Sequence, residues 1–128
     1  MAKIAVVDDA KLMRTILMAA LEQAGHEVVV LEPLAASEVG DILQQHAPDL
    51  LLTDFNMPGA NGATVIRMAR RVLPELPVVV VTAFGDAETT ALLKKLNVGA
   101  VLRKPVRPED VKVAVAAALR VIEPPSLD

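Results

Sequence analysis

The stretch LLTDFNMPG, residues 51–59, decides how this chain folds. It begins with apolar residues typical of a buried β-strand, and one acid, Asp54, stands where that strand is expected to end. Pro58 and Gly59 then predict a tight turn. Why a carboxylate stands at the end of a buried strand depends on what the rest of the sequence places beside it.

Apolar runs of the same kind recur along the chain, at residues 3–7, 27–31, 49–53, 77–83 and 100–103. They are continuous in Val, Leu and Ile, which is typical of parallel strands covered on both faces. Helical patterns separate them. We expect Asp9 to cap the first helix and Gly25 to end it. The other helices are expected at 35–46, at 61–72, between the capping residue Asp86 and Gly99, and from Pro108 onward.

Five strand–helix units in 128 residues predict one α/β domain. Its architecture is expected to be a three-layer sandwich, with five helices covering a five-stranded parallel sheet and right-handed crossovers. We expect residues 1–122 to form this domain. The closing residues 123–128, EPPSLD, are expected to be a tail or the start of a linker.

Composition excludes several classes of protein. Hydrophobic residues make up 53% of the chain, yet no apolar run approaches the roughly 20 residues that span a bilayer. The N-terminus soon becomes acidic, unlike a signal peptide, and the absence of cysteine excludes disulfides and fits the cytoplasm. The net charge of −3, with no Trp or Tyr, argues against direct binding of nucleic acid.

Polar residues follow the predicted strands at one end. Asp8 and Asp9 follow the first strand, Asp54 the third, Thr82 the fourth and Lys104 the fifth. Ligands of open α/β sheets bind at the carboxyl ends of the strands, so these side chains are expected to share one cleft. Neighbouring carboxylates raise each other's pKa, and a divalent cation, Mg²⁺ for an all-oxygen site, relieves the repulsion. With a lysine and a hydroxyl nearby, the set predicts phosphoryl transfer to Asp54.

Over residues 3 to about 121 the sequence resembles the receiver domain of bacterial two-component response regulators, the CheY-like family. The matching segments are VVDDAKLMR (6–14), LLTDFNMPGANG (51–62), VVVTAFGD (79–86) and RKP (103–105). The resemblance implies a flavodoxin-like fold with strand order 2-1-3-4-5. It also implies a cis bond between Lys104 and Pro105.

The same resemblance assigns roles to the cleft residues. Asp54 would be the phosphoacceptor, and Asp9, Asp54 and the backbone carbonyl of Asn56 would bind Mg²⁺, with Asp8 acting largely through water. Thr82 and Lys104 would bind the phosphoryl oxygens. The phosphoryl donor would be a histidine kinase or a phosphotransfer protein, and the switched receiver would control a downstream protein or an output domain. Such a domain catalyses only its own phosphorylation and dephosphorylation.

The chain departs from the family pattern at Val101, three residues before Lys104, where receivers usually carry an aromatic switch residue. Without a ring to rotate, coupling from Thr82 is expected to use smaller movements. Phe84 is expected to border the cleft and slow dephosphorylation. On the last helix, Val113, Ala117 and neighbouring small residues are expected to form an exposed surface. This surface would contact a partner or a second copy of the chain, through the face formed by the last two helices and the last strand. The alternative is that the helix is simply rich in Ala, a good helix former.

Two other functions share features with this pattern. A phosphatase of the haloacid dehalogenase type also uses an Asp nucleophile with Mg²⁺, but it needs an acid two residues later, where this chain has Asn56. A receiver used only as a phosphorylation-independent interaction module would usually lack an acid or the lysine, and neither is missing here. The sequence leaves open whether the chain acts alone or belongs to a longer regulator or hybrid kinase.

Overall fold

The computed structural model describes residues 2–31, 36–57, 60–83 and 85–120. Its main sheet consists of β1 (Lys3–Val7), β2 (Glu27–Leu31), β3 (Leu50–Asp54), β6 (Val78–Thr82) and β7 (Ala100–Arg103). All neighbouring pairs are parallel, and the order across the sheet is β2-β1-β3-β6-β7. This order confirms the expected 2-1-3-4-5 arrangement of the five strands.

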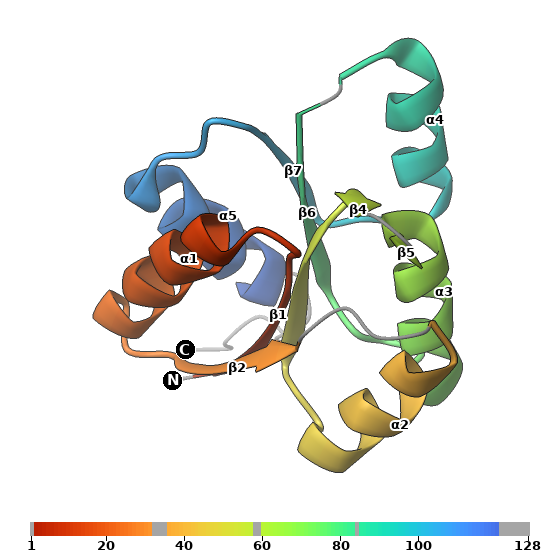
Figure 1. Ribbon diagram of the computed structural model, residues 1–128, viewed down its shortest axis with the longest axis horizontal. Coiled ribbons are helices and arrows are strands. Elements are labelled where there is room, and N and C mark those ends of the chain that lie inside the picture. The colour runs from red at the N-terminus through yellow and green to blue at the C-terminus, as the bar shows by residue number, and fades with distance from the viewer. Residues whose placement is uncertain (1, 32–35, 58–59, 84, 121–128) are drawn as a thin grey trace, which may run out of the picture.

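Five helices cover the two faces of the sheet: α1 (Lys11–Gln23), α2 (Ala36–His46), α3 (Gly62–Val72), α4 (Ala87–Lys95) and α5 (Pro108–Arg120). Figure 1 shows α1 and α5 on one face and α2, α3 and α4 on the other, which confirms the three-layer sandwich. An additional antiparallel pair, β4 (Asn56–Met57) and β5 (Ala60–Asn61), was not predicted. None of the helices within the described residues has the length and apolar character needed to cross a membrane.

The core explains why the central strands read as continuous apolar runs. Every residue of β3 and β6 is buried. Leu51 and Val80 belong to the cluster under α2 and α3, whereas Leu52 and Val79 belong to the cluster under α1 and α5. Burying a Val or Leu side chain stabilises the fold by roughly 1.5–3 kcal/mol. The two strands that end in Asp54 and Thr82 are therefore the most firmly supported part of the sheet.

The helix ends confirm some predictions and correct others. Asp86 caps α4 by accepting a hydrogen bond from the Thr89 N–H at 2.7 Å, and Gly25 adopts a left-handed φ of 90° after α1. Asp9 does not cap α1, because the helix begins one residue later, with Ala10 as N-cap and no side-chain cap. The Ala10 N–H instead donates to Asp8 Oδ1 at 2.8 Å, so the local contact belongs to the other acid of the pair.

The expectation that Gly99 ends α4 is wrong. The helix ends at Lys95, and Asn97 takes the left-handed conformation with φ of 54°. Gly99 instead lies where the chain passes α5, since an added Cβ would stand 3.2 Å from the Ala118 Cβ. The predictions on Phe84 and the closing residues 121–128 lie outside the described residues, and the domain boundary at 122 stays a prediction.

Candidate functional site

The parallel register brings the predicted polar residues to one edge of the sheet. Val7 is paired with Thr53, and Thr82 is paired with Arg103, so the residues that end or follow these strands lie level with one another. Asp54 ends β3, and the Lys104 N–H donates to the Thr82 carbonyl at 2.9 Å. The candidate site is therefore built on four adjacent strand ends, not on a long loop.

Three carboxylates meet at this edge. Asp8, Asp9 and Asp54 each offer an oxygen within 4.8 Å of the others. Asp8 is fully buried and Asp54 is 4% exposed, whereas Asp9 is exposed. Two carboxylates of the cluster are therefore buried and the third faces solvent, so a ligand can reach the cluster from outside.

The two carboxylate oxygens of Asp8 differ in their hydrogen bonding. Oδ1 accepts the Ala10 N–H, while the buried Oδ2 has no hydrogen-bond partner. Burial raises the pKa of Asp8, the Ala10 hydrogen bond opposes that rise, and the charge of Asp54 adds to it. Arg14, which the sequence reasoning missed, donates to the Asp8 backbone carbonyl at 2.9 Å and holds the loop that carries this acid.

Lys104 supplies the positive charge of the site. Its Nζ lies 3.2 Å from Asp54 Oδ2 and 3.7 Å from Asp8 Oδ2. One ammonium thus contacts two buried carboxylates, and three acids with one lysine leave a surplus of negative charge. The Lys104–Pro105 bond is cis, as the resemblance implied.

The donor set fits a hard divalent cation. All three side chains offer carboxylate oxygens, which Mg²⁺ prefers, and Asp8 Oδ2 is a buried acceptor with an unused lone pair. Asn56, the other predicted metal ligand, lies two residues after Asp54 in β4, where it is paired with Asn61. Thr82 is 1% exposed at the end of β6, beside this cluster in the sheet order.

The segment after Asp54 is fixed by a close approach that the sequence reasoning did not identify. Gly62 opens α3, and its N–H donates to the Phe55 carbonyl at 2.7 Å. A Cβ at Gly62 would stand 2.7 Å from the Phe55 Cα and 2.8 Å from the Asp54 carbonyl oxygen. Asn61 caps the helix by accepting the Ala63 N–H at 2.7 Å. The signal for both residues was the turn sequence PGANG.

We expect Gly62→Ala to lower the free energy of unfolding by about 1–3 kcal/mol, because the added methyl group collides with backbone atoms that cannot rotate away. Urea denaturation followed by circular dichroism measures the change. Gly40→Ala is the matched control: it lies inside α2 with its nearest neighbours 3.7 Å and 3.8 Å from an added Cβ, and it should stabilise by about 0.5–1 kcal/mol. Equal effects of the two substitutions would contradict the close approach.

The predicted output residues lie at the surface. Val101 on β7 is 46% exposed and lines a pocket of about 310 Å³ between α4 and β7. Val113 on α5 is 69% exposed, and Ala117 is also exposed. Valine is smaller than the aromatic residue that receivers usually carry at this position, and the pocket lies directly beside it.

Comparison with known proteins gives a consistent result. The family model described as the response regulator receiver domain matches residues 4–116. A chemotaxis protein CheY homolog of Campylobacter jejuni is 32% identical, with 86% of each chain covered. The DNA-binding transcriptional regulator NtrC of Klebsiella pneumoniae is 35% identical over 91% of this chain and 24% of its own length.

The chain matches part of some longer regulators and shares the fold of a solved receiver domain. The phosphate regulator PhoB of Pseudomonas aeruginosa is 31% identical over 91% of this chain and 51% of its own length. This chain thus spans about a quarter to a half of those two DNA-binding or transcriptional regulators. The crystal structure of a receiver domain protein from Clostridium thermocellum superposes with a TM-score of 0.81 at 29% identity, covering 94% of this chain and 96% of that one.

Proposed function

The chain belongs to the response regulator receiver domain family, and from this premise we propose that it accepts a phosphoryl group on Asp54 and thereby switches a partner protein. The observation that carries the proposal is the meeting of Asp8, Asp9, Asp54 and Lys104 at one sheet edge, with a buried carboxylate oxygen left without a hydrogen bond. An unsatisfied buried acceptor is costly, and a ligand that uses it offsets the cost.

The proposed reaction is an in-line displacement at phosphorus. A carboxylate oxygen of Asp54 forms a bond to phosphorus, and the bond from phosphorus to the donor breaks, with its electron pair leaving on the donor nitrogen or oxygen. Asp54 is held for this attack by the buried strand β3 beneath it. Little further chemistry is required of the protein, because positioning and charge neutralisation account for most of the catalysis.

The other residues have distinct parts in this proposal. Asp8, Asp9, Asp54 and the Asn56 carbonyl would hold Mg²⁺, which when bound neutralises charge on the transferring phosphoryl oxygens. Lys104 would leave its present contact with Asp54 Oδ2 in favour of a phosphoryl oxygen, since both are anionic acceptors within reach of one flexible ammonium. The Thr82 hydroxyl would donate to another phosphoryl oxygen.

The direct test is the intact mass of the protein after incubation with acetyl phosphate, a small phosphoryl donor. We expect one phosphoryl adduct per chain in the presence of Mg²⁺ and none when EDTA replaces it, because the acid cluster repels the incoming anion unless a cation is bound. Absence of an adduct in a protein that still binds Mg²⁺ would favour a phosphorylation-independent interaction module.

The partners follow from the same proposal. A histidine kinase or a phosphotransfer protein would supply the phosphoryl group, and a downstream protein or an output domain would respond. NtrC is named as a DNA-binding transcriptional regulator and is about four times as long as the matched region, so this chain corresponds to the receiver part of such proteins. Direct contact with nucleic acid is not proposed for this domain, whose net charge is −3.

We also propose that the face of α4, β7 and α5 carries a homodimer contact. Ala117→Glu, on the exposed side of α5, should reduce the mass of the phosphorylated form measured by light scattering towards that of a monomer, because a buried carboxylate opposes association. Ala19→Glu, on the exposed side of α1, is the control and should leave the mass unchanged. Identical masses for all forms, with and without beryllofluoride as phosphoryl analogue, would exclude the dimer.

A further inference from the structure

The C-terminal end of α4 is tied down by a side chain from another helix. Arg70 of α3 donates from Nη1 to the Leu96 carbonyl and from Nη2 to the Asn97 carbonyl, the second at 2.9 Å. Its Nε donates to the Leu76 carbonyl at 3.4 Å. Leu96 is the C-cap of α4, so the guanidinium meets the negative end of that helix. One side chain therefore links the last turn of α4 to the segment that enters β6.

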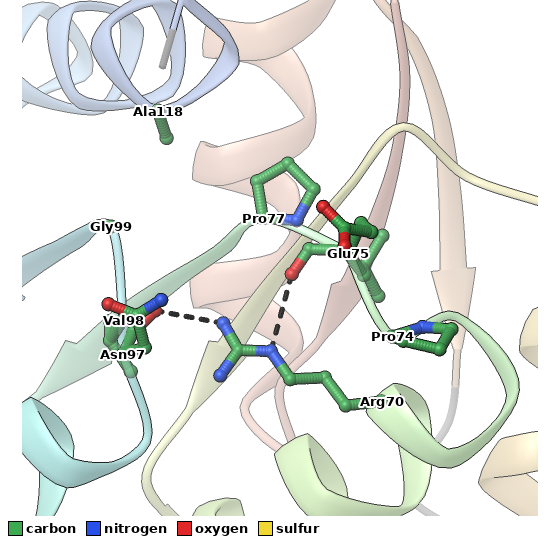
Figure 2. A pocket seen from close by; sticks show the side chains of 9 residues that line it. Arg70, Pro74, Glu75, Pro77, Asn97, Val98, Gly99 and Ala118 are labelled. Atoms are coloured by element: carbon green, nitrogen blue, oxygen red, sulfur yellow. Dashed lines mark hydrogen bonds between the residues drawn. The ribbon is translucent and has the colours of Figure 1, made fainter. Parts of the chain in front are cut away.

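The Arg70 side chain lies along a pocket. Arg70 lines a pocket of about 500 Å³, together with Pro77, Asn97, Gly99 and Ala118. Figure 2 shows the guanidinium lying between the Asn97 region and the chain before Pro77, with hydrogen bonds on both sides. Burial lowers the pKa of Arg70, as expected for a guanidinium partly removed from water.

α4 packs less deeply against the core than α3 does, although Leu92 and the C-cap residue Leu96 are partly buried against it. Of its nine residues, all of which the structure describes, Leu93 is the one that is buried. By contrast, α3 buries five residues, Gly62, Ala63, Val65, Ile66 and Ala69. The pocket of about 310 Å³ beside Leu93 and Val101 leaves further space under α4. A helix with so few buried apolar contacts is expected to move more readily than its neighbours.

The two ends of α4 are connected to different parts of the molecule. Its N-terminal end, capped by Asp86, follows Thr82 of the candidate site by a short connection. Its C-terminal end is held by Arg70 at the opposite edge of the sheet, where β6 and β7 begin. A displacement that starts near Thr82 would therefore act first on the N-terminal end of α4.

We infer that Arg70 makes the C-terminal end of α4 a pivot, so that phosphorylation, which rests on the function proposed above, swings the N-terminal end of the helix. Arg70 is a positioning residue and lies outside the phosphoryl site. Such a pivot is compatible with Val101 at the position where receivers usually carry an aromatic switch residue. A helix held at one end can turn a small displacement near Thr82 into a larger displacement of its free end, so that no aromatic side chain has to rotate.

The absence of cysteine makes this inference testable with spin labels. One label at Glu22→Cys on α1 is paired either with Glu88→Cys near the start of α4 or with Lys95→Cys at its end; all three positions are exposed. Distances are measured by pulsed electron paramagnetic resonance, with and without Mg²⁺ and beryllofluoride. We expect the Glu88 pair to shift by roughly 2 Å, as helix shifts in switching proteins do, while the Lys95 pair keeps its distance.

Substitution of Arg70 tests the clamp without any ligand. Arg70→Met removes every donor but keeps an unbranched, though shorter, apolar side chain. It should broaden the ligand-free Lys95 distance distribution about twofold, as expected for a locally released segment. Arg70→Lys retains the positive charge but loses the several N–H donors of the guanidinium. Its distance distribution should be intermediate in width between those of the parent and Arg70→Met. Arg71→Met, an exposed arginine on the same helix, is the control and should match the parent. Urea denaturation verifies that each variant is folded.

The outcomes separate the pivot from the phosphoryl chemistry. An Arg70→Met distribution identical to the parent would overturn the clamp, and a Lys95 shift as large as the Glu88 shift would overturn the pivot. A phosphoryl adduct without movement of either label would refute the pivot and leave the proposed function standing. If no adduct forms, the proposed function and the swing fail together, and the ligand-free comparison decides whether Arg70 holds the end of α4.

Discussion

Asp54→Asn is expected to abolish the phosphoryl adduct formed with acetyl phosphate and Mg²⁺. The amide oxygen carries no charge and is a far weaker nucleophile than a carboxylate oxygen, so the loss in adduct should be about 100-fold or more, to below detection. The substitution keeps the shape of a side chain that is 4% exposed, so the sheet should remain folded. Intact-protein mass spectrometry measures the adduct, and circular dichroism verifies the fold.

A matched control separates loss of the nucleophile from loss of negative charge. Asp41→Asn removes one carboxylate from the exposed side of α2 and should leave the adduct unchanged. Persistence of the adduct in Asp54→Asn would show that another residue is the phosphoacceptor. Asp9, the exposed member of the carboxylate cluster, would be the first to examine. Peptide mass mapping would then identify the modified residue.

The sheet was predictable because its strands carry their own signal. β3 and β6 are buried along their whole length, so each had to be apolar at every position, and both appeared in the sequence as continuous runs. The site was predictable for a related reason. A parallel sheet brings its strand ends to one edge, so Asp8, Asp54 and Lys104, which follow or end separate strands, could be placed together without a structure.

Features set by long-range contact were not predictable. Asp9 has the right spacing for a helix cap, but Asp8 makes the local hydrogen bond because α1 begins one residue later than the pattern indicated. Gly99 has the right residue type for a helix end, yet it serves the approach of α5 and leaves the left-handed position to Asn97. Arg70 gave no signal at all, since its three carbonyl partners lie 6, 26 and 27 residues away.

Asp8→Asn is expected to stabilise the metal-free protein while weakening its response to Mg²⁺. The carboxylate of Asp8 is fully buried beside Asp54, and one of its oxygens has no hydrogen bond. Replacing an incompletely compensated buried charge by a neutral side chain of the same shape should raise the free energy of unfolding at pH 7 by about 1–2 kcal/mol. Urea denaturation in EDTA measures this change.

The sign of the pH dependence follows from the raised pKa of Asp8. A carboxyl group with a higher pKa in the folded than in the unfolded state favours folding while it is protonated, and that contribution is lost as pH rises through the folded-state pKa. The advantage of Asp8→Asn should therefore be greatest near neutral pH and should disappear at pH values below the ordinary pKa of an aspartate. The opposite trend would show that Lys104 more than compensates the buried charge.

In the presence of Mg²⁺ the parent protein should become more stable to unfolding than Asp8→Asn. A cation that binds the folded state stabilises it in proportion to the logarithm of its concentration over the dissociation constant, and Asp8 Oδ2 is the buried oxygen most in need of such a partner. We expect the dissociation constant for Mg²⁺ to rise about tenfold or more in Asp8→Asn, as is typical when a residue that supports a metal is lost. Asp41→Asn should change neither the stability in EDTA nor the response to Mg²⁺. If Asp8→Asn were less stable than the parent in EDTA and equally responsive to Mg²⁺, Asp8 would be a structural ion-pair partner of Lys104 and the metal would have to rely on Asp9 and Asp54.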